Sequence, residues 1–146
     1  MATRYVASGR ALASAANSNM LSLRSSGTSR CGILELHLFS EAATAFVAPA
    51  LFLTSVVDTA GTVVAGQKED NGAAGPVTVV STGPTGGTLA AVATRRGVLP
   101  SVVGSGLMWI WPESAPLMVP PLLSALLRND GALGPAVTWV VVWQED

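Results

Sequence analysis

The sequence contains few residues that could carry chemistry or cross-link the chain. Among its 146 residues there is one cysteine, Cys31, and one histidine, His37. A single cysteine excludes an internal disulfide bond, and one Cys with one His cannot form a Cys/His metal cluster of any recognised spacing. We therefore expect no metal and no cofactor, and a fold stabilised by its hydrophobic core.

Long apolar runs are also missing. A membrane-spanning helix needs about 20 mostly apolar residues. The longest apolar stretches, FVAPALFL and LMVPPLLSALL, are short and interrupted by Pro49, Pro120 and Pro121. The opening MATRYVASGRALASAANSNM lacks the apolar core of about 7–15 residues that secretory signals contain. We expect no membrane partner.

Charge is scarce as well. Charged residues make up 12% of the chain, against roughly 25% in typical soluble domains. Hydrophobic residues make up 49%, and the mean hydropathy is +0.49. Because large apolar patches on soluble proteins usually mark contacts, this composition favours association with partners. The alternative is an Ala- and Gly-rich domain with an unusually neutral surface.

The charge balance argues against nucleic acid as a partner. A net charge of −1 and a pI near 5.7 create no general attraction to phosphates. The one basic pair, Arg95 and Arg96, is too small a footprint for a nucleic-acid site. We expect these two arginines to form ion pairs on the surface or between chains.

Alternation of apolar and polar residues predicts short strands along the chain. In CGILELHLFS the predicted faces are Leu34, Leu36 and Leu38 on one side, and Ile33, Glu35, His37 and Phe39 on the other. SGLMWIWPES alternates Leu107, Trp109 and Trp111 with Met108 and Ile110. The C-terminal VTWVVVWQED is apolar on both faces, so it requires a second layer on one side and a loop or neighbouring subunit on the other.

The strands are about eight in number, with no regular alternation of strand and helix, which predicts an all-β fold. We expect a single domain over 1–146, an antiparallel β-sandwich of jelly-roll type. Residues 1–19 would form an extended arm or a first strand. Residues 61–106 would form a long Gly- and Pro-rich excursion, and 122–128 fits a strand or a marginal helix.

Candidate chemical groups are isolated from one another. His37 and Glu35 share a strand face and could form an acid/base pair, yet no nucleophile lies at a recognisable spacing, so a polar strand face is the favoured interpretation. The flanks of Cys31, RCGI, match no nucleophile signature, which favours a structural cysteine at a strand start. QKEDNG lacks the spacing of an EF-hand loop, and STGPTGG lacks the lysine of a P-loop. We expect no enzyme.

The tryptophans are the most informative side chains. Trp109, Trp111, Trp139 and Trp143 lie on two predicted strands. Such residues serve as large packing units in sandwich cores, and they are also enriched at protein interfaces. Three alternatives stay open: core, subunit interface, in which Arg95 and Arg96 would take part, and ligand platform.

The order of these features resembles a group of small tailed-phage virion proteins of β-sandwich fold. The resemblance lies in an opening RYVASGRA strand, TSRCGILELHLFSEAATA, the Gly-rich excursion, SGLMWIWPES, the double proline of LMVPP, an LRNDG turn, and an apolar last strand with an acidic end. LLSALL is richer in leucine than the Gly-rich segment that would follow the double proline, so the conformation of Leu122 to Arg128 is left open.

The resemblance implies a structural virion protein, with a capsid decoration or cement protein as the favoured role. Such a protein would form a homotrimer and bind the major capsid protein on the capsid surface. The alternative is a tail, baseplate or head-fibre component that binds a host glycan, with Gly66 to Gly87 as its recognition loop.

Overall fold

The computed structural model describes residues 2–11, 17–69 and 75–146, and these residues contain strands and no helix. The part of the chain so described therefore has no helix that could span a membrane. The strands are β1 Thr3–Ala11, β2 Asn19–Arg24, β3 Cys31–Ser40, β4 Pro49–Thr59, β5 Thr62–Val64, β6 Gln67–Lys68, β7 Val79–Thr82, β8 Thr85–Leu89, β9 Arg95–Arg96, β10 Gly106–Ile110, β11 Leu117–Val119, β12 Ser124–Asn129 and β13 Val137–Glu145.

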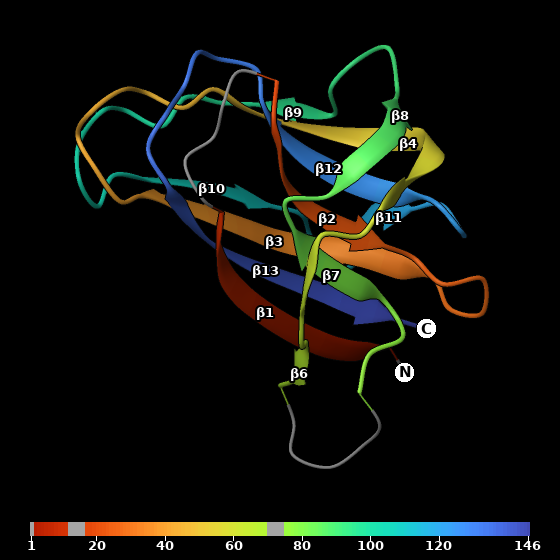
Figure 1. The fold of residues 1–146 in the computed structure, drawn as a ribbon. Coiled ribbons are helices and arrows are strands. Elements are labelled where there is room, and N and C mark those ends of the chain that lie inside the picture. Colours follow the sequence, from red (N-terminus) through yellow and green to blue (C-terminus); the bar gives the residue numbers. More distant parts are fainter. Residues whose placement is uncertain (1, 12–16, 70–74) are drawn as a thin grey trace.

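These strands form two antiparallel sheets that pack face to face (Figure 1). Sheet A has the order β10-β3-β13-β1-β6, with β11 also pairing with β3. Sheet B has the order β5-β7-β2-β12-β4-β8, with β9 also pairing with β4. The expected all-β sandwich is confirmed.

Eight of the strands give the sandwich its jelly-roll winding. In chain order these are β1, β2, β3, β4, β8, β10, β12 and β13. β1 pairs with β13 and β2 with β12, while β3 pairs with β10 and β4 with β8. Successive strands therefore alternate between the sheets until β4 pairs with β8, as in a double Greek key.

The excursion predicted over 61–106 is more structured than expected. It contains β5 to β9, which extend both sheets. In sheet A, β6 pairs with β1. In sheet B, β5 and β7 lie beyond β2, and β8 and β9 pair with different parts of β4. Short β-branched runs such as TVV and VVST become strands here because an existing sheet edge supplies their pairing partners. Residues 70–74, which include Asp70 and Asn71, lie outside the described part.

The core lies between the sheets, and β13 runs through its centre. Val137, Trp139, Val141 and Trp143 belong to one hydrophobic cluster with residues of both sheets. The strand is flanked by β1 and β3 along its whole length, so its backbone groups are paired on both sides. This central place explains why one face of VTWVVVWQED is apolar throughout.

The predicted faces of β3 need one correction. Cys31, Ile33, Leu36 and Leu38 all join the core cluster, whereas Leu34 does not. The register with β13 shifts between Val142 and Trp143 and passes over Leu34, which marks a β-bulge. Because a bulge inserts one extra residue, it reverses the alternation beyond it, and Ile33 exchanges faces with Leu34.

Two open questions about local structure are settled by pairing. Residues Thr3–Ala11 form a full strand against β13, so the first-strand alternative for the N-terminus is confirmed. Residues Ser124–Asn129 form β12 between β2 and β4, which confirms a strand over most of 122–128. Leu122 itself has a φ of 59°, a left-handed conformation that reverses the chain just before β12.

Candidate interaction surfaces

The four tryptophans are buried within the single chain. Trp139 and Trp143 are 0% exposed, and Trp109 and Trp111 are below 10%. The rings of Trp143 and Tyr5 stack with their centroids 5.7 Å apart. Burial supports the core alternative, and it leaves these rings almost no surface for a partner or a ligand.

Arg95 and Arg96 lie on β9 and are exposed, but both have contacts inside the chain. Arg96 forms an ion pair with Asp130 at 2.6 Å, and the Arg95 guanidinium lies 5.7 Å from the centre of the Trp111 ring. Both contacts leave much of each side chain in solvent. A role for this pair between chains stays a prediction.

His37 and Glu35 form the polar face that the sequence indicated. The His37 Nε2 atom lies 2.8 Å from a Glu35 carboxylate oxygen on the outer face of sheet A. The other Glu35 oxygen is 3.9 Å from Arg4, which also forms ion pairs with Glu69 and Glu113. Cys31 points to the opposite, inner face, so the geometry separates the one thiol from the one imidazole.

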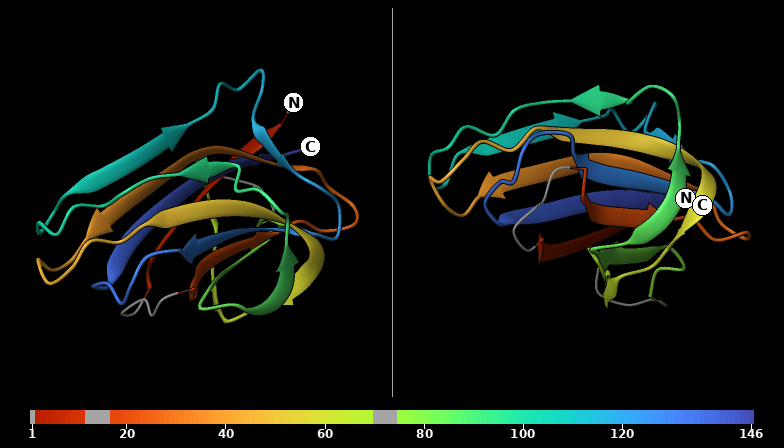
Figure 2. Two further views of the ribbon diagram at one scale, coloured as in Figure 1. Left: turned by 90° about the horizontal axis from the view of Figure 1, so that it is seen from above. Right: turned by 45° about the horizontal axis from the view of Figure 1, so that its top comes forward.

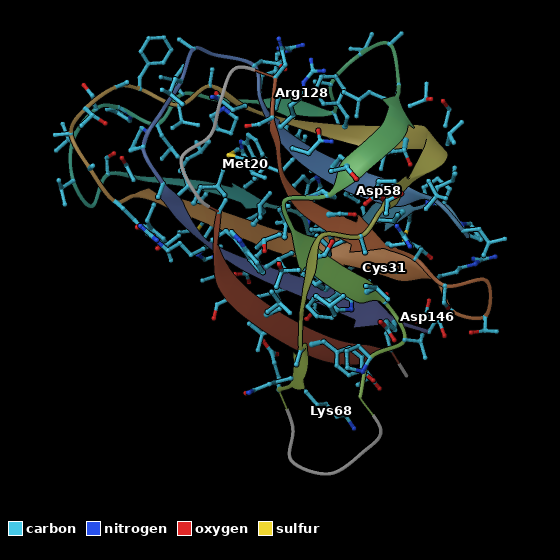
Figure 3. The ribbon with its side chains drawn as sticks, viewed as in Figure 1. Met20, Cys31, Asp58, Lys68, Arg128 and Asp146 are labelled. Carbon is cyan, nitrogen blue, oxygen red and sulfur yellow. The ribbon has the colours of Figure 1, made fainter. Side chains whose placement is uncertain are left out.

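Cys31 begins β3 and is 0% exposed, as expected for a structural cysteine. Burial raises the pKa of its thiol to about 12. It lies at the end of the sandwich where the chain terminates, near Asp146 (Figure 3). The thiol therefore stays protonated at neutral pH, a state in which it is a weak nucleophile.

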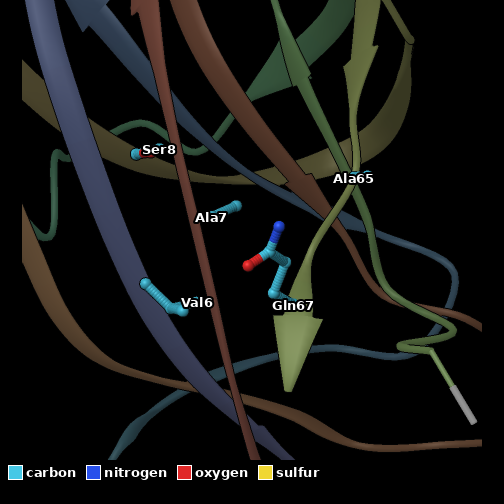
Figure 4. Close-up of a pocket in the computed structure, with 5 residues that line it drawn as sticks. All are labelled: Val6, Ala7, Ser8, Ala65 and Gln67. Carbon is cyan, nitrogen blue, oxygen red and sulfur yellow. The ribbon is translucent and has the colours of Figure 1, made fainter. Parts of the chain in front are cut away.

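Three hollows lined by described residues are small and open. One of about 180 Å³ is lined by Val6, Ala7, Ser8, Ala65 and Gln67, with the Gln67 amide reaching toward β1 (Figure 4). Two others, of about 320 and 300 Å³, are lined around Arg10 and Arg30. Ligand pockets usually enclose about 300–1,000 Å³. No aromatic ring lines any of these three, so none offers the stacking platform typical of a sugar site.

The outer face of sheet B is covered by the chain itself. Asp58 lies where β4 meets β8, and its buried carboxylate accepts the hydroxyl hydrogen of Ser124 (Figure 3). Gly87 on β8 lies against Asp58 and Leu126, so that a Cβ at this glycine would be 3.2 Å from the Asp58 Cβ. Phe52, on the same face, packs beneath the guanidinium of Arg128. These contacts therefore cover the part of this face around Asp58 and Phe52.

Exposed apolar side chains gather on three connections at one end of the sandwich. Connections 41–48, 97–105 and 130–136 meet there (Figure 1). Backbone hydrogen bonds between Val47 and Leu99, and from Asp130 to Ala48, join them. We call the following set, each between 52% and 64% exposed, the loop-end patch: Phe46, Val98, Val102, Val103 and Leu133.

The loop-end patch has almost no charge around it. The three connections contain two charged residues, Glu41 and Asp130. Glu41 pairs with Arg10 at 2.5 Å, and Asp130 pairs with Arg96 and Arg128. Both carboxylates of the three connections are therefore paired inside the chain, and the patch presents apolar side chains on a hydrogen-bonded framework.

A second exposed apolar set lies on the outer face of sheet A, at its β10 edge. Its members are between 38% and 61% exposed, and we call them the edge patch: Phe39, Met108, Ile110 and Met118. The alternation of SGLMWIWPES placed Met108 and Ile110 on the face opposite Trp109 and Trp111, and in the structure these two tryptophans point into the core.

The loop-end patch was missed by sequence reasoning. Its residues lie in connections rich in Gly, Ala and Pro, where apolar residues follow no period. The available signal was their number in segments expected to be polar loops.

Comparisons of the chain with protein-family models, with curated proteins and with solved structures find no match.

Proposed function

We propose that this chain is a structural protein of a tailed-phage virion, a capsid decoration or cement protein that binds between major capsid subunits and stabilises the head. The observation that carries the proposal is the loop-end patch: five exposed apolar side chains on joined loops whose two carboxylates, Glu41 and Asp130, are paired inside the chain. Such a surface suits tight contact with another protein. Jelly-roll sandwiches recur in viral capsid domains, which supports the same class by analogy of fold.

The stabilising effect would come from burying these side chains. Transfer of a Val, Leu or Phe side chain from full exposure to full burial contributes about 1.5–3 kcal/mol. Each member of the loop-end patch still exposes more than half of its surface, so each contributes about half of that amount. The free energy of one such contact is modest. Many identical contacts on one capsid together stabilise the shell against the pressure of packed DNA.

The partners in this proposal are the major capsid protein and further copies of the chain. The homotrimer expected from the sequence stays a prediction. The location on the capsid surface follows from the proposed role, and the low net charge suits it because such a surface has no strong attraction for the packaged genome.

The test is to delete the gene in the phage that carries it and to compare purified virions with and without the protein. We expect wild-type virions to contain the chain in many copies, and deleted virions to release DNA at a lower temperature. Purified wild-type chain added back should restore heat resistance, whereas the Val103→Asp variant should bind more weakly. Absence of the chain from virions, or identical heat resistance, would refute the proposal.

The alternative role, a tail or head-fibre component that binds a host glycan, has one observation in its favour. The hollow of about 320 Å³ beside the excursion is lined by Arg10, Gly61, Thr62, Thr82 and Gly83, which offer a guanidinium and two hydroxyl groups. Glycan-array binding that is lost in Thr62→Ala/Thr82→Val would favour it over the capsid role. Binding by neither protein nor glycan partners would exclude both.

A further inference from the structure

The edge of sheet A formed by β10 has backbone groups that no described residue pairs. β10 is the terminal strand of its sheet and pairs with β3 alone. The N–H of Trp111 donates to the carbonyl of Leu34, so alternate residues Trp109 and Leu107 also point their backbone groups toward β3. Those of Gly106, Met108 and Ile110 point away, toward the free edge. Figure 2 (left) shows β10, in teal, as the outermost ribbon on that side.

This edge lacks the devices that usually prevent pairing. Natural edge strands carry lysines, prolines, bulges or covering loops. GLMWI contains none of these side chains, and the register with β3 is unbroken. Pro112 is the next residue after Ile110 whose backbone faces the edge. Because proline lacks an N–H, pairing along this edge is limited to Gly106–Ile110.

We propose that β10 pairs antiparallel with β10 of a second copy of this chain, about a two-fold axis through Met108. In this register Met108 lies opposite its own mate, and Gly106 lies opposite Ile110 of the second copy. The backbone groups that face the edge on both strands are then all paired. A continuous sheet forms across the two copies, with an isologous interface.

The side chains fit this register. Gly106 has no side chain, and on its own sheet it neighbours Phe39, whose ring lies against it: a Cβ at Gly106 would be 3.0 Å from the ring. Ile110 of the second copy, 61% exposed in the single chain, would cross this glycine and pack on the Phe39 ring. Shifting the register by two residues places Met108 against Gly106 or Ile110 and loses this match.

The electrostatics also permit a self-contact. β10 carries no charge, and the ionisable groups next to it on the same face, Glu35 and His37, are bonded to each other one strand further in. The two-fold register places Glu35 of one copy in the same cross-strand row as the uncharged Phe39 of the other, with Ile110 and Gly106 between them. Like charges therefore do not meet across the junction, and the apolar side chains of the edge patch are covered.

The first experiment measures mass in solution. A short strand buries less than the roughly 800 Å² per partner of a standard interface, so the chain should be examined by sedimentation from about 10 to 300 µM. We expect the wild-type chain to form dimers or an even-numbered oligomer. Met108→Lys places two cations side by side across the two-fold axis, so this variant should form monomers or species of half the wild-type mass. The control Val92→Lys changes a residue that is 76% exposed elsewhere and should leave the mass unchanged.

The second experiment tests the register by disulfide cross-linking. Met108→Cys would meet itself across the axis with Cα atoms about 5.5 Å apart, within the range of a disulfide. Ile110→Cys would lie about 13 Å from its mate and should not cross-link, since each strand residue rises about 3.4 Å. The native Cys31 is buried and gives no background.

Three outcomes would overturn the proposal. These are a wild-type chain that stays monomeric at the highest concentration, a trimer as the final species, and equal cross-linking of Met108→Cys and Ile110→Cys. A final trimer would instead support the homotrimer expected from the sequence, to which the two-fold contact is an alternative. All variants should keep the wild-type circular dichroism spectrum, because the replaced side chains are exposed. The inference does not depend on the capsid role, which could fail while the dimer stands.

Discussion

Gly9 on β1 lies directly opposite Trp139 on β13, and the indole ring covers the glycine. A Cβ built at Gly9 would be 2.5 Å from Cζ2 of Trp139, so this position accepts no side chain while the ring stays in place. Trp143, the other tryptophan of β13, also lies against a glycine. A Cβ at Gly66 would be 2.5 Å from Cη2 of Trp143. Glycine thus provides the space in which β13 buries its two tryptophans.

Gly9→Ala should destabilise the protein through this overlap. Overpacking a filled core costs about 1–3 kcal/mol, and the loss should appear in the free energy of unfolding measured in urea. Gly75→Ala is the matched control, because no described residue lies within 4 Å of a Cβ there, and it should have little effect. The double variant Gly9→Ala/Trp139→Phe should lose less than the sum of its single changes, since the smaller ring makes room. Additive losses would contradict the overlap.

The tryptophan itself should be among the most costly residues to truncate. Trp139→Ala removes a side chain that is 0% exposed and should cost about 3–5 kcal/mol of unfolding free energy. A folded chain of unchanged stability that has lost only its partners would show instead that the ring serves an interface. Urea unfolding together with sedimentation separates these outcomes.

Prediction from the sequence succeeded where one periodicity governed a whole strand. The separation of Trp109 and Trp111 from Met108 and Ile110 on opposite faces follows from alternation alone, and the structure shows that the tryptophans face the core. It failed at Ile33 and Leu34, because a bulge is set by the register with β13 rather than by the residues of β3. The loop-end patch was also beyond reach, since the connections that carry Phe46 and Leu133 are joined by hydrogen bonds between residues distant in sequence, such as the bond from Asp130 to Ala48.

Glu145 gives stability that should depend on pH. Burial raises the pKa of its carboxyl, but hydrogen bonds from Thr78, from the Trp143 indole and from the Val77 N–H outweigh this and hold it below the ordinary 4.5. A lowered folded-state pKa means that the stability is present above pH 4.5 and is lost as the pH falls through the folded value.

The measurement is urea unfolding of the wild type and of Glu145→Gln from pH 7 to pH 3. The wild type should be the more stable at pH 7, and the difference should shrink below about pH 4.5. Glu41, whose pKa is also lowered, through its bonds to Thr138 and Arg10, titrates in both proteins and so cancels in the comparison. A constant difference across this range would contradict the role of Glu145.

Cys31 should be inert to thiol reagents in the folded protein. Its side chain is 0% exposed and its pKa is raised to about 12 by burial, so neither access nor thiolate is available at pH 8. Labelling with an aromatic disulfide should proceed at the rate of unfolding and become complete in denaturant. Fast labelling of the native chain would show that the start of β3 opens locally.

The ion pair of Arg24 and Asp58 should be coupled far more strongly than an exposed pair. The Asp58 side chain is fully buried, with its carboxylate 3.7 Å from Arg24 and hydrogen-bonded to Ser124. Removing the cation leaves this carboxylate without a charge partner, so a double-mutant cycle of Arg24→Gln and Asp58→Asn should give a coupling above about 1 kcal/mol. The control cycle uses Arg10 and Glu41, whose arginine is largely exposed, and should give about 0.5 kcal/mol or less. Equal couplings would mean that β8 does not shield Asp58 from water as its place beside Gly87 indicates.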